Sequence, residues 1–175
     1  AGLDGSAQWR ARYDEWLYYF DALGLTGVSL GWLTLAKAGR DDPDLCFEEW
    51  PWQVAQPIGE RMAGRSQAVT WARLDDEDLL ARRWRIAPDV DNETTGRPGA
   101  ADPDHIVLRQ RRGLCRAVEM TTASGGVLGA CDGELTLAQI TGAVSAILEV
   151  DYDALLAEVL PLVRECLRYG ILETA

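Results

Sequence analysis

The last third of the chain contains the stretch that decides the fold, TLAQITGAVSAILEVDYDALLAEVLPLVRECLRYGILE, residues 136–173. Apolar residues recur there at helical spacing, which predicts two amphipathic helices in succession. Thr136 and Gln139 have the spacing of a capping box at the start of the first helix, and Asp151 can cap the second. Gly170 can end the second helix in a left-handed conformation.

The flanking residues extend this pattern on both sides. A shorter helix is predicted at 122–131, and two strand-like runs at 106–111 and 114–120 predict a β-hairpin before it. After the last helix, residues 171–173 can return as a short strand. Three helices with flanking strands predict a winged-helix-like module over residues 105–175.

The first third of the chain predicts a helix followed by a hairpin. Aromatic and apolar residues at helical spacing predict a helix at 8–23, which Gly24 ends. An apolar run at 27–36 and an alternating run at 45–50 predict two strands. Because only a short turn separates them, an antiparallel hairpin is favoured. The predicted fold class is therefore α+β.

The middle of the chain predicts a connector, so that three regions follow one another: 1–56, 57–104 and 105–175. Within the connector, the sequence predicts helices at 58–73 and 76–84. Prolines and glycines among polar residues predict a loop at 88–104.

Composition and charge limit the classes of partner. The 175 residues are 47% hydrophobic, enough to bury a core, and carry a net charge of −11 that is acidic in every region. Nucleic-acid binding depends on cationic side chains, and the predicted helix at 137–148 has no basic residue, so direct DNA binding is disfavoured. No apolar run approaches the ~20 residues of a membrane span, and residues 1–5 lack the features of a signal peptide, so a cytoplasmic protein is expected.

Three features of the sequence bear on catalysis or metal binding: a G-x-S-x-G match, the cysteines with His105, and a glycine-rich run. Residues 27–31 match G-x-S-x-G around Ser29, but the expected structure continues as strand, whereas the nucleophile elbow needs a helix directly after the serine. Four unpaired cysteines and the single His105 lack the spacing of a zinc site, so reduced core cysteines are expected. The glycines of 125–129 favour close helix packing. We expect no catalytic, cofactor-binding or metal-binding residue in this chain.

Two groups of side chains are candidate contacts for a substrate or partner. The first is a basic cluster, which predicts either an anion or RNA contact or an exposed strand face balanced by carboxylates. The second consists of tryptophans, which either stack on a ligand or pack in a core. The candidates are Arg109, Arg111, Arg112 and Arg116 in the first group, and Trp50 and Trp52 in the second.

A set of short stretches extends over nearly the whole chain: Arg12-Tyr13 with Trp16-Leu17 and Phe20, 31–35 (GWLTL), 48–51 (EEWP), Asp102-Pro103 with 105–110 (HIVLRQ), and 130–135 (ACDGEL). Together they resemble the C-terminal region of bacterial class I S-adenosylmethionine-dependent methyltransferases, a group related to the protein-glutamine and N6-adenine methylases. The last seventy residues are also similar to small PqqD-like winged-helix domains, some of which hold peptides.

The resemblance implies that residues 1–56 are the end of a Rossmann-like methyltransferase sheet, whose last two strands form an antiparallel hairpin. It also implies that the parent protein binds S-adenosylmethionine through a missing N-terminal domain. The family's glycine-rich cofactor loop and its Asn-Pro-Pro-aromatic motif are not in this sequence, where the only asparagine, Asn92, precedes Glu93. No catalytic residue can therefore be carried over, and the chain alone is expected to be inactive.

Two functions follow as expectations. In the first, the chain is the accessory part of a methyltransferase and presents or selects a protein or nucleic-acid substrate. In the second, it is a non-enzymatic winged-helix module that binds a peptide or a partner protein.

Overall fold

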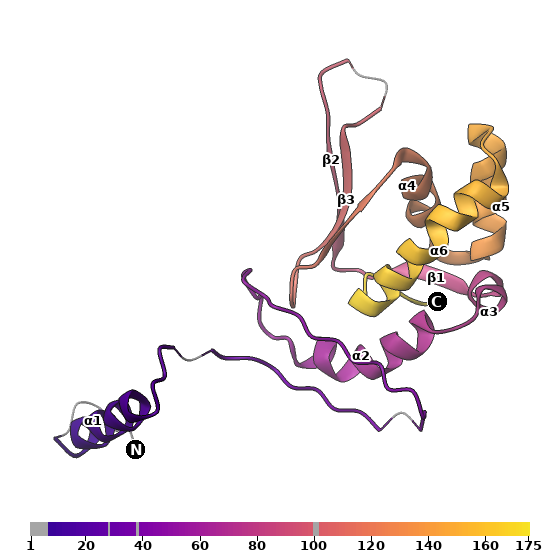
Figure 1. Ribbon diagram of the computed structural model, residues 1–175. Coiled ribbons are helices and arrows are strands. Elements are labelled where there is room, and N and C mark those ends of the chain that lie inside the picture. The colour runs from indigo at the N-terminus through magenta and orange to yellow at the C-terminus, as the bar shows by residue number, and fades with distance from the viewer. Residues whose placement is uncertain (1–6, 28, 38, 100–101) are drawn as a thin grey trace. The chain divides into compact units, whose positions relative to one another are not determined.

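The computed structural model describes residues 7–27, 29–37, 39–99 and 102–175, which form two compact units (Figure 1). The division falls between Leu35 and Ala36. Residues 1–5, expected to lack a signal peptide, and Val28 of the G-x-S-x-G match lie outside the described residues. The described part of the first unit contains one helix, α1 (Ala7–Ala22), which confirms the helix predicted at 8–23.

The second unit is a mixed α+β structure, as the sequence predicts. Its described residues form five helices and two antiparallel three-stranded sheets. The helices are α2 (Gly59–Ala72), α3 (Asp76–Ala81), α4 (Thr122–Gly129), α5 (Leu137–Leu148) and α6 (Tyr152–Tyr169). The strands are β1 (Arg83–Ile86), β2 (Val90–Thr95), β3 (His105–Gln110), β4 (Ala117–Met120), β5 (Asp132–Thr136) and β6 (Leu172–Thr174).

The C-terminal part has a winged-helix-like order of elements: α4, β5, α5, α6 and β6. Its sheet has the strand order β5-β1-β6, so the central strand comes from residues that precede the whole module in the sequence. Both pairings of β1 are antiparallel. The strand β1 therefore joins the middle of the chain to the last helices in one fold.

The second sheet is a meander of β2, β3 and β4 (Figure 1). In the β3–β4 pair, Ile106 lies opposite Met120 and Leu108 opposite Val118. This pairing confirms the hairpin predicted between residues 106 and 120. The strand β2 occupies residues expected to be a loop, and it pairs with β3 along its whole length.

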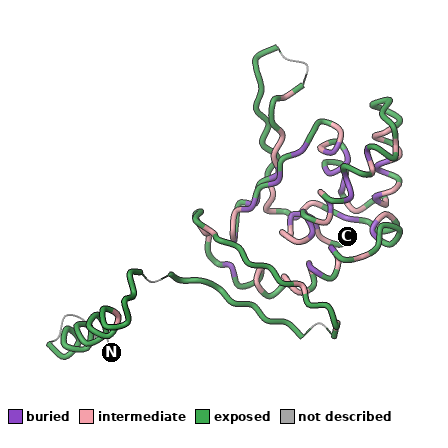
Figure 2. Tube along the Cα trace, viewed as in Figure 1, coloured by how far each residue is buried: buried purple, intermediate pink, exposed green. Residues whose placement is uncertain are grey.

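The hydrophobic core lies between α4, α5, α6 and the β5-β1-β6 sheet (Figure 2). Trp84 on β1 is completely buried, and its Nε1 donates a hydrogen bond to the Leu79 carbonyl at 3.0 Å. The apolar stripe of α6 is buried as its helical spacing predicts. Its buried members are Leu155, Val159, Leu160, Val163, Cys166 and Leu167.

The predicted helix ends are confirmed by the capping contacts. Thr136 and Gln139 form a reciprocal capping box at α5, and the Asp151 side chain accepts a hydrogen bond from the Ala154 amide at α6. Gly170 ends α6 with a φ of 70°. These contacts are local in sequence, which explains why spacing alone predicted them.

The hairpin predicted from 27–36 and 45–50 is wrong. No strand forms among the described residues of either run. Leu30, Leu33 and Leu35 are 98%, 84% and 85% exposed, so the first run lacks the covering layer that a buried strand needs. An isolated two-stranded hairpin is only marginally stable, and the described chain provides no third strand for it.

The connector expected at 57–104 is also largely folded. The helix predicted at 58–73 is present as α2, which packs against α6. The helix predicted at 76–84 ends at Ala81, after which Arg83 and Trp84 belong to β1. The physical reason is long-range pairing: β1 is held by β5 and β6, partners that no local pattern reveals.

Two glycine-to-alanine substitutions are expected to have opposite effects. At Gly170, a Cβ would lie 2.7 Å from Nη1 of Arg61 at a φ of +70°. Gly170→Ala should therefore destabilise the fold by about 1–2 kcal/mol through left-handed strain alone. Gly64 lies inside α2 with nothing within 4 Å of its Cβ position, so Gly64→Ala should stabilise by about 0.5–1 kcal/mol. Urea unfolding of both variants checks the pair, and equal midpoints would contradict this interpretation.

Among the helices of the described residues, none is both long and apolar enough to cross a lipid bilayer.

Candidate functional site

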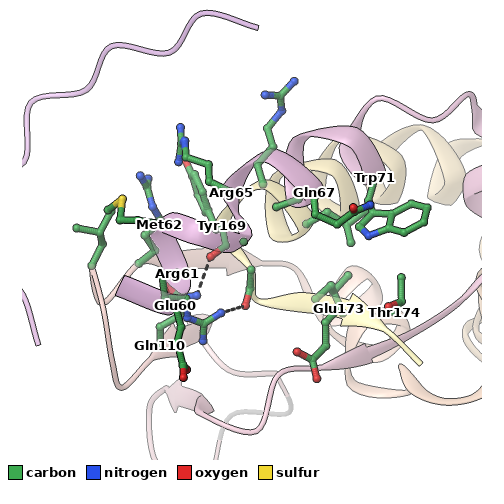
Figure 3. A pocket seen from close by; sticks show the side chains of 18 residues that line it. Glu60, Arg61, Met62, Arg65, Gln67, Trp71, Gln110, Tyr169, Glu173 and Thr174 are labelled. Atoms are coloured by element: carbon green, nitrogen blue, oxygen red, sulfur yellow. Dashed lines mark hydrogen bonds between the residues drawn. The ribbon is translucent and has the colours of Figure 1, made fainter. Parts of the chain in front are cut away.

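A pocket of about 290 Å³ lies between α2, the C-terminal end of α6 and β6 (Figure 3). Its apolar lining includes Leu167 and Leu172, which are 1% and 2% exposed. Polar and charged groups of α2 and β6 also line it: Glu60, Arg61, Arg65, Gln67, Glu173 and Thr174. The volume is at the lower limit of the ~300–1,000 Å³ typical of small-molecule sites, so the pocket suits side chains better than a large cofactor.

Two hydrogen-bond networks hold one end of this pocket in shape. Arg61 donates from Nη1 to the Gly170 carbonyl at 2.6 Å and pairs with Asp89 through Nη2. Gln110 donates from Nε2 to the Tyr169 carbonyl at 2.7 Å. Figure 3 draws the hydrogen bonds of Arg61 and Gln110 to these two carbonyls. These side chains satisfy carbonyls at the end of α6, which have no partner within the helix. Their role at this end is structural.

Arg116 is the most deeply buried arginine of the described residues that line this pocket, with 5% of its side chain exposed. Its guanidinium lies 4.7 Å from the ring centroid of Trp50 and 4.2 Å from that of Tyr169. Two hydrogen bonds, of 2.9 and 2.5 Å, join its Nη1 and Nη2 to the carboxylate oxygens of Glu48. A planar guanidinium between two aromatic rings, bound bidentately, is a rigid receptor for one carboxylate.

Glu48 belongs to an acidic segment of the second unit, residues 42–50, that is held by arginines of the same unit. Asp42 pairs with Arg73, and Asp44 accepts hydrogen bonds from Nη1 of Arg168 at 3.0 and 2.8 Å. The intervening apolar residues point the other way, since Leu45 is 74% exposed and Phe47 is 90% exposed. This alternation is that of an extended chain, with one face held by arginines and the other uncovered.

The ion pair of Glu48 should make stability depend on pH. Hydrogen bonds from Arg116 hold the pKa of Glu48 below its ordinary value of 4.5. Because the folded pKa is depressed, the stabilisation is fully present above about pH 4.5 and is lost as the pH falls through the folded pKa.

We therefore expect Glu48→Gln to destabilise the protein most near neutral pH. The difference in unfolding midpoint from the unsubstituted protein should shrink towards about pH 3. Urea titrations at several pH values measure it, and a difference that grows on acidification would contradict the assigned ion pair. Glu134→Gln is the exposed control.

The predicted basic cluster does not form one patch. Arg109 pairs with Glu93 at 2.8 Å, and Arg111 lies 3.3 Å from Asp91, both across the β2–β3 pair. Arg116 points away from them into the buried site with Trp50. Of the two tryptophans, Trp50 is thus half-buried against Arg116, whereas Trp52 is 71% exposed. Arg112 is exposed, and no ion pair to it is found among the described residues.

Sequence reasoning missed the other arginines that hold the acidic segment, Arg65, Arg73 and Arg168. Arg65 lies on α2, Arg73 directly follows α2, and Arg168 lies on α6. Because α2 and α6 are about a hundred residues apart in the sequence, no local spacing connects these arginines. The signal that could have found the contact was the alternation of Asp42, Asp44 and Glu48 on one face of an extended run.

Among the described residues, the glycine-rich run 125–129 does not have the geometry of a Rossmann-type site for S-adenosylmethionine. A Rossmann-type site needs glycines in a turn between a strand and a helix, where the backbone approaches the ligand. Gly125 and Gly126 instead lie within α4, where an added Cβ would come within 3.6 Å of Ile106 and of Val144. These are ordinary van der Waals distances, and a Cβ at Gly129 would meet nothing within 4 Å, so the packing around α4 does not require glycine at any of the three positions and the expected close packing is not confirmed.

The two buried thiols are poor nucleophiles. Burial raises the pKa of Cys131 to about 12 and also raises that of Cys166, so both thiols stay protonated. Both are core residues as expected, whereas Cys46 is exposed and Cys115 half-buried. No helix follows Ser29 in the described run 29–37, and a nucleophile elbow needs one. The described residues also contain no group of three or more metal-ligating side chains.

Comparison with known protein families, with curated proteins and with solved structures found no match for this chain.

Proposed function

We propose that the chain is the C-terminal accessory part of an S-adenosylmethionine-dependent methyltransferase, not catalytic on its own. It would complete the sheet of the catalytic domain and present or select the substrate. The observation that supports this proposal best is the exposure of large apolar side chains across residues 7–50. Soluble proteins rarely leave such surface uncovered, and a partner surface is its usual explanation.

The helix α1 is the first part of that surface. This helix has no buried residue. Its large apolar and aromatic side chains are exposed, with exposed fractions of 41%, 51%, 59% and 47% for Trp9, Tyr13, Trp16 and Leu17. Short helices draw most of their stability from tertiary packing of an apolar face. The exposure of these large side chains supports a further domain as the proposed cover of this face.

The acidic segment 42–50 is the second part. Its arginine contacts fix one face and leave Leu45 and Phe47 directed outward. A fixed, extended backbone with an uncovered apolar face has the properties of a strand that joins a sheet. In the proposal, the sheet belongs to the methyltransferase domain, and the arginines couple that domain to the winged-helix-like module.

The methyl-transfer chemistry would come entirely from S-adenosylmethionine bound to the catalytic domain. The residues of this chain would contribute only the docking of that domain and the positioning of the substrate. The proposal places the protein in the cytoplasm, where the free thiols remain reduced.

A second candidate function is a non-enzymatic module that binds a peptide or a partner protein. The pocket beside β6 favours it, because its volume suits a side chain of a bound partner. The two candidates differ in what covers residues 7–50, a methyltransferase domain in the first and an unrelated partner in the second.

The experiment uses the chain alone and together with the polypeptide encoded directly upstream of it. We expect calorimetry to detect no binding of S-adenosylmethionine by the chain alone, and clear binding by the combination. Hydrogen exchange should then show new protection at α1 and at residues 45–50. Binding by the chain alone, or an upstream polypeptide that neither binds the cofactor nor protects these residues, would overturn the proposal.

A further inference from the structure

The acidic segment 42–50 is attached to the second unit by charge and not by burial. None of its residues belongs to the hydrophobic core, and only Asp44 and Trp50 are half-buried. Ion pairs of Asp42, Asp44 and Glu48 hold it instead. Partly exposed ion pairs contribute little net stability, and a segment that buries little apolar surface opens readily. The segment can therefore leave its site while the core stays folded.

The arginines beneath this segment form one continuous surface. Glu48 contacts two of them, at 2.5 Å and 3.8 Å, and Asp44 contacts the other two, at 2.8 Å and 3.7 Å. Four residues of extended chain separate these carboxylates by about 13 Å. The arginine surface consists of Arg116 and Arg65 beside Glu48, and of Arg168 and Arg73 beside Asp44.

Opening of the segment would leave these four cations without their carboxylates. The Arg116 guanidinium would remain oriented, because its stacking partner Tyr169, 4.2 Å away, belongs to α6 and not to the segment. An oriented guanidinium offers two parallel donors to an incoming carboxylate. The vacated surface is therefore a ready receptor for another anionic chain.

The charges favour an acidic peptide over a nucleic acid. Residues 42–50 themselves show the fit, since both carboxylate oxygens of Glu48 accept hydrogen bonds from Arg116. Glu60 and Glu173 line the adjoining pocket, and the chain has a net charge of −11. These negative charges oppose a dense row of phosphates. A peptide with two correctly spaced carboxylates replaces those of the segment one for one.

We propose that the arginine surface is a receptor for an extended acidic segment of a partner protein, and that residues 42–50 occupy it in cis. The partner has two carboxylates four residues apart and an aromatic residue two positions after the second, as Asp44, Glu48 and Trp50 are arranged here. Because a tethered segment has a high effective concentration, residues 42–50 inhibit binding until several contacts replace theirs together.

This inference rests on the proposed function only in its consequence. If residues 45–50 join the sheet of a methyltransferase domain, a bound acidic partner would release the segment that couples that domain to the winged-helix-like module. The exchange of one acidic segment for another requires neither the methyl donor nor the catalytic domain, so it can be tested separately.

The test uses the full chain and a synthetic peptide of residues 41–52, DDPDLCFEEWPW, under reducing conditions. Asp44→Asn combined with Glu48→Gln in the chain weakens the contacts in cis and leaves all four arginines in place. We expect calorimetry to show that the peptide binds this double variant at least about tenfold more tightly than it binds the unsubstituted protein. A peptide with the same two substitutions should bind the double variant at least about tenfold more weakly.

The matched control is Asp91→Asn combined with Glu93→Gln. It also removes two carboxylates paired with arginines, because Asp91 lies beside Arg111 and Glu93 beside Arg109. We expect it to leave the affinity for the acidic peptide unchanged. An equal gain in affinity would overturn the inference, because any two arginines freed of their carboxylates would then suffice.

Hydrogen exchange on the unsubstituted protein gives a second readout, which decides the matter if the double variant does not fold. A millimolar excess of the acidic peptide should speed exchange of the amides of residues 42–50 and leave α6 unchanged, whereas the neutral peptide should do neither. Unchanged exchange, or no binding to a folded double variant, would contradict the inference. Tighter binding of a mixed-sequence oligonucleotide than of the acidic peptide would also overturn it and assign the surface to phosphates. None of these results would alter the S-adenosylmethionine experiment.

Discussion

Val163→Asp is expected to unfold the second unit, residues 36–175. Val163 is 0% exposed and lies in the middle of the apolar face of α6. An aspartate there would be a buried charge without a partner, at a cost of about 4 kcal/mol or more. Because domains are stable by only about 5–15 kcal/mol, the loss removes much or all of the net stability.

Thermal unfolding followed by circular dichroism measures this effect. The matched control is Ala157→Asp, which introduces the same charge on the exposed side of the same helix and should cost about 0.5 kcal/mol or less. A cooperative transition of Val163→Asp within a few degrees of the unsubstituted protein would show that this face of α6 is not in the core.

Arg116→Leu is the second substitution with a large expected effect. It removes both hydrogen bonds to the Glu48 carboxylate, which keeps only a 3.8 Å contact with Arg65, and it removes the guanidinium between Trp50 and Tyr169. Breaking a buried ion pair costs about 3–5 kcal/mol, and the 32% exposure of Glu48 lowers our expectation to about 2–3 kcal/mol.

A local consequence distinguishes this loss from general destabilisation. Residues 42–50 should become more accessible to limited proteolysis before the rest of the second unit unfolds, because Arg116 holds the centre of the segment. Arg109→Leu is the control, since its pair with Glu93 is about half exposed and should contribute about 1 kcal/mol or less. Equal proteolysis of the two variants would contradict the anchoring role of Arg116.

The local part of the fold could be predicted from the sequence. Thr136 with Gln139, Asp151 and Gly170 marked three helix ends, because capping contacts join residues only a few positions apart. The spacing of apolar residues identified the buried face of α6 because helical periodicity reflects burial directly. The β3–β4 hairpin was predictable for a similar reason, since its strands are close in sequence.

The candidate site was predicted only in its parts. Arg116 and Trp50 were both candidates, but sequence reasoning treated one as part of a basic cluster and the other as a separate stacking group. Their contact depends on Glu48, which lies 68 positions before Arg116. The pairing of Arg109 and Arg111 with carboxylates of β2 was one of the two alternatives left open, and it became decidable only when β2 was seen beside β3.

By itself, the sequence determined the α+β class, the start of α5, both ends of α6, and the apolar stripe that packs α6 into the core. Tertiary structure alone decided that Trp84 lies on a central strand and that Arg116 receives Glu48. It also decided that the alternating run 45–50 is held by arginines instead of pairing with 27–36. The physical reason is the range of the interactions: caps and periodicity are encoded within a few residues, whereas strand partners and buried ion pairs depend on which distant segments the folded chain brings together.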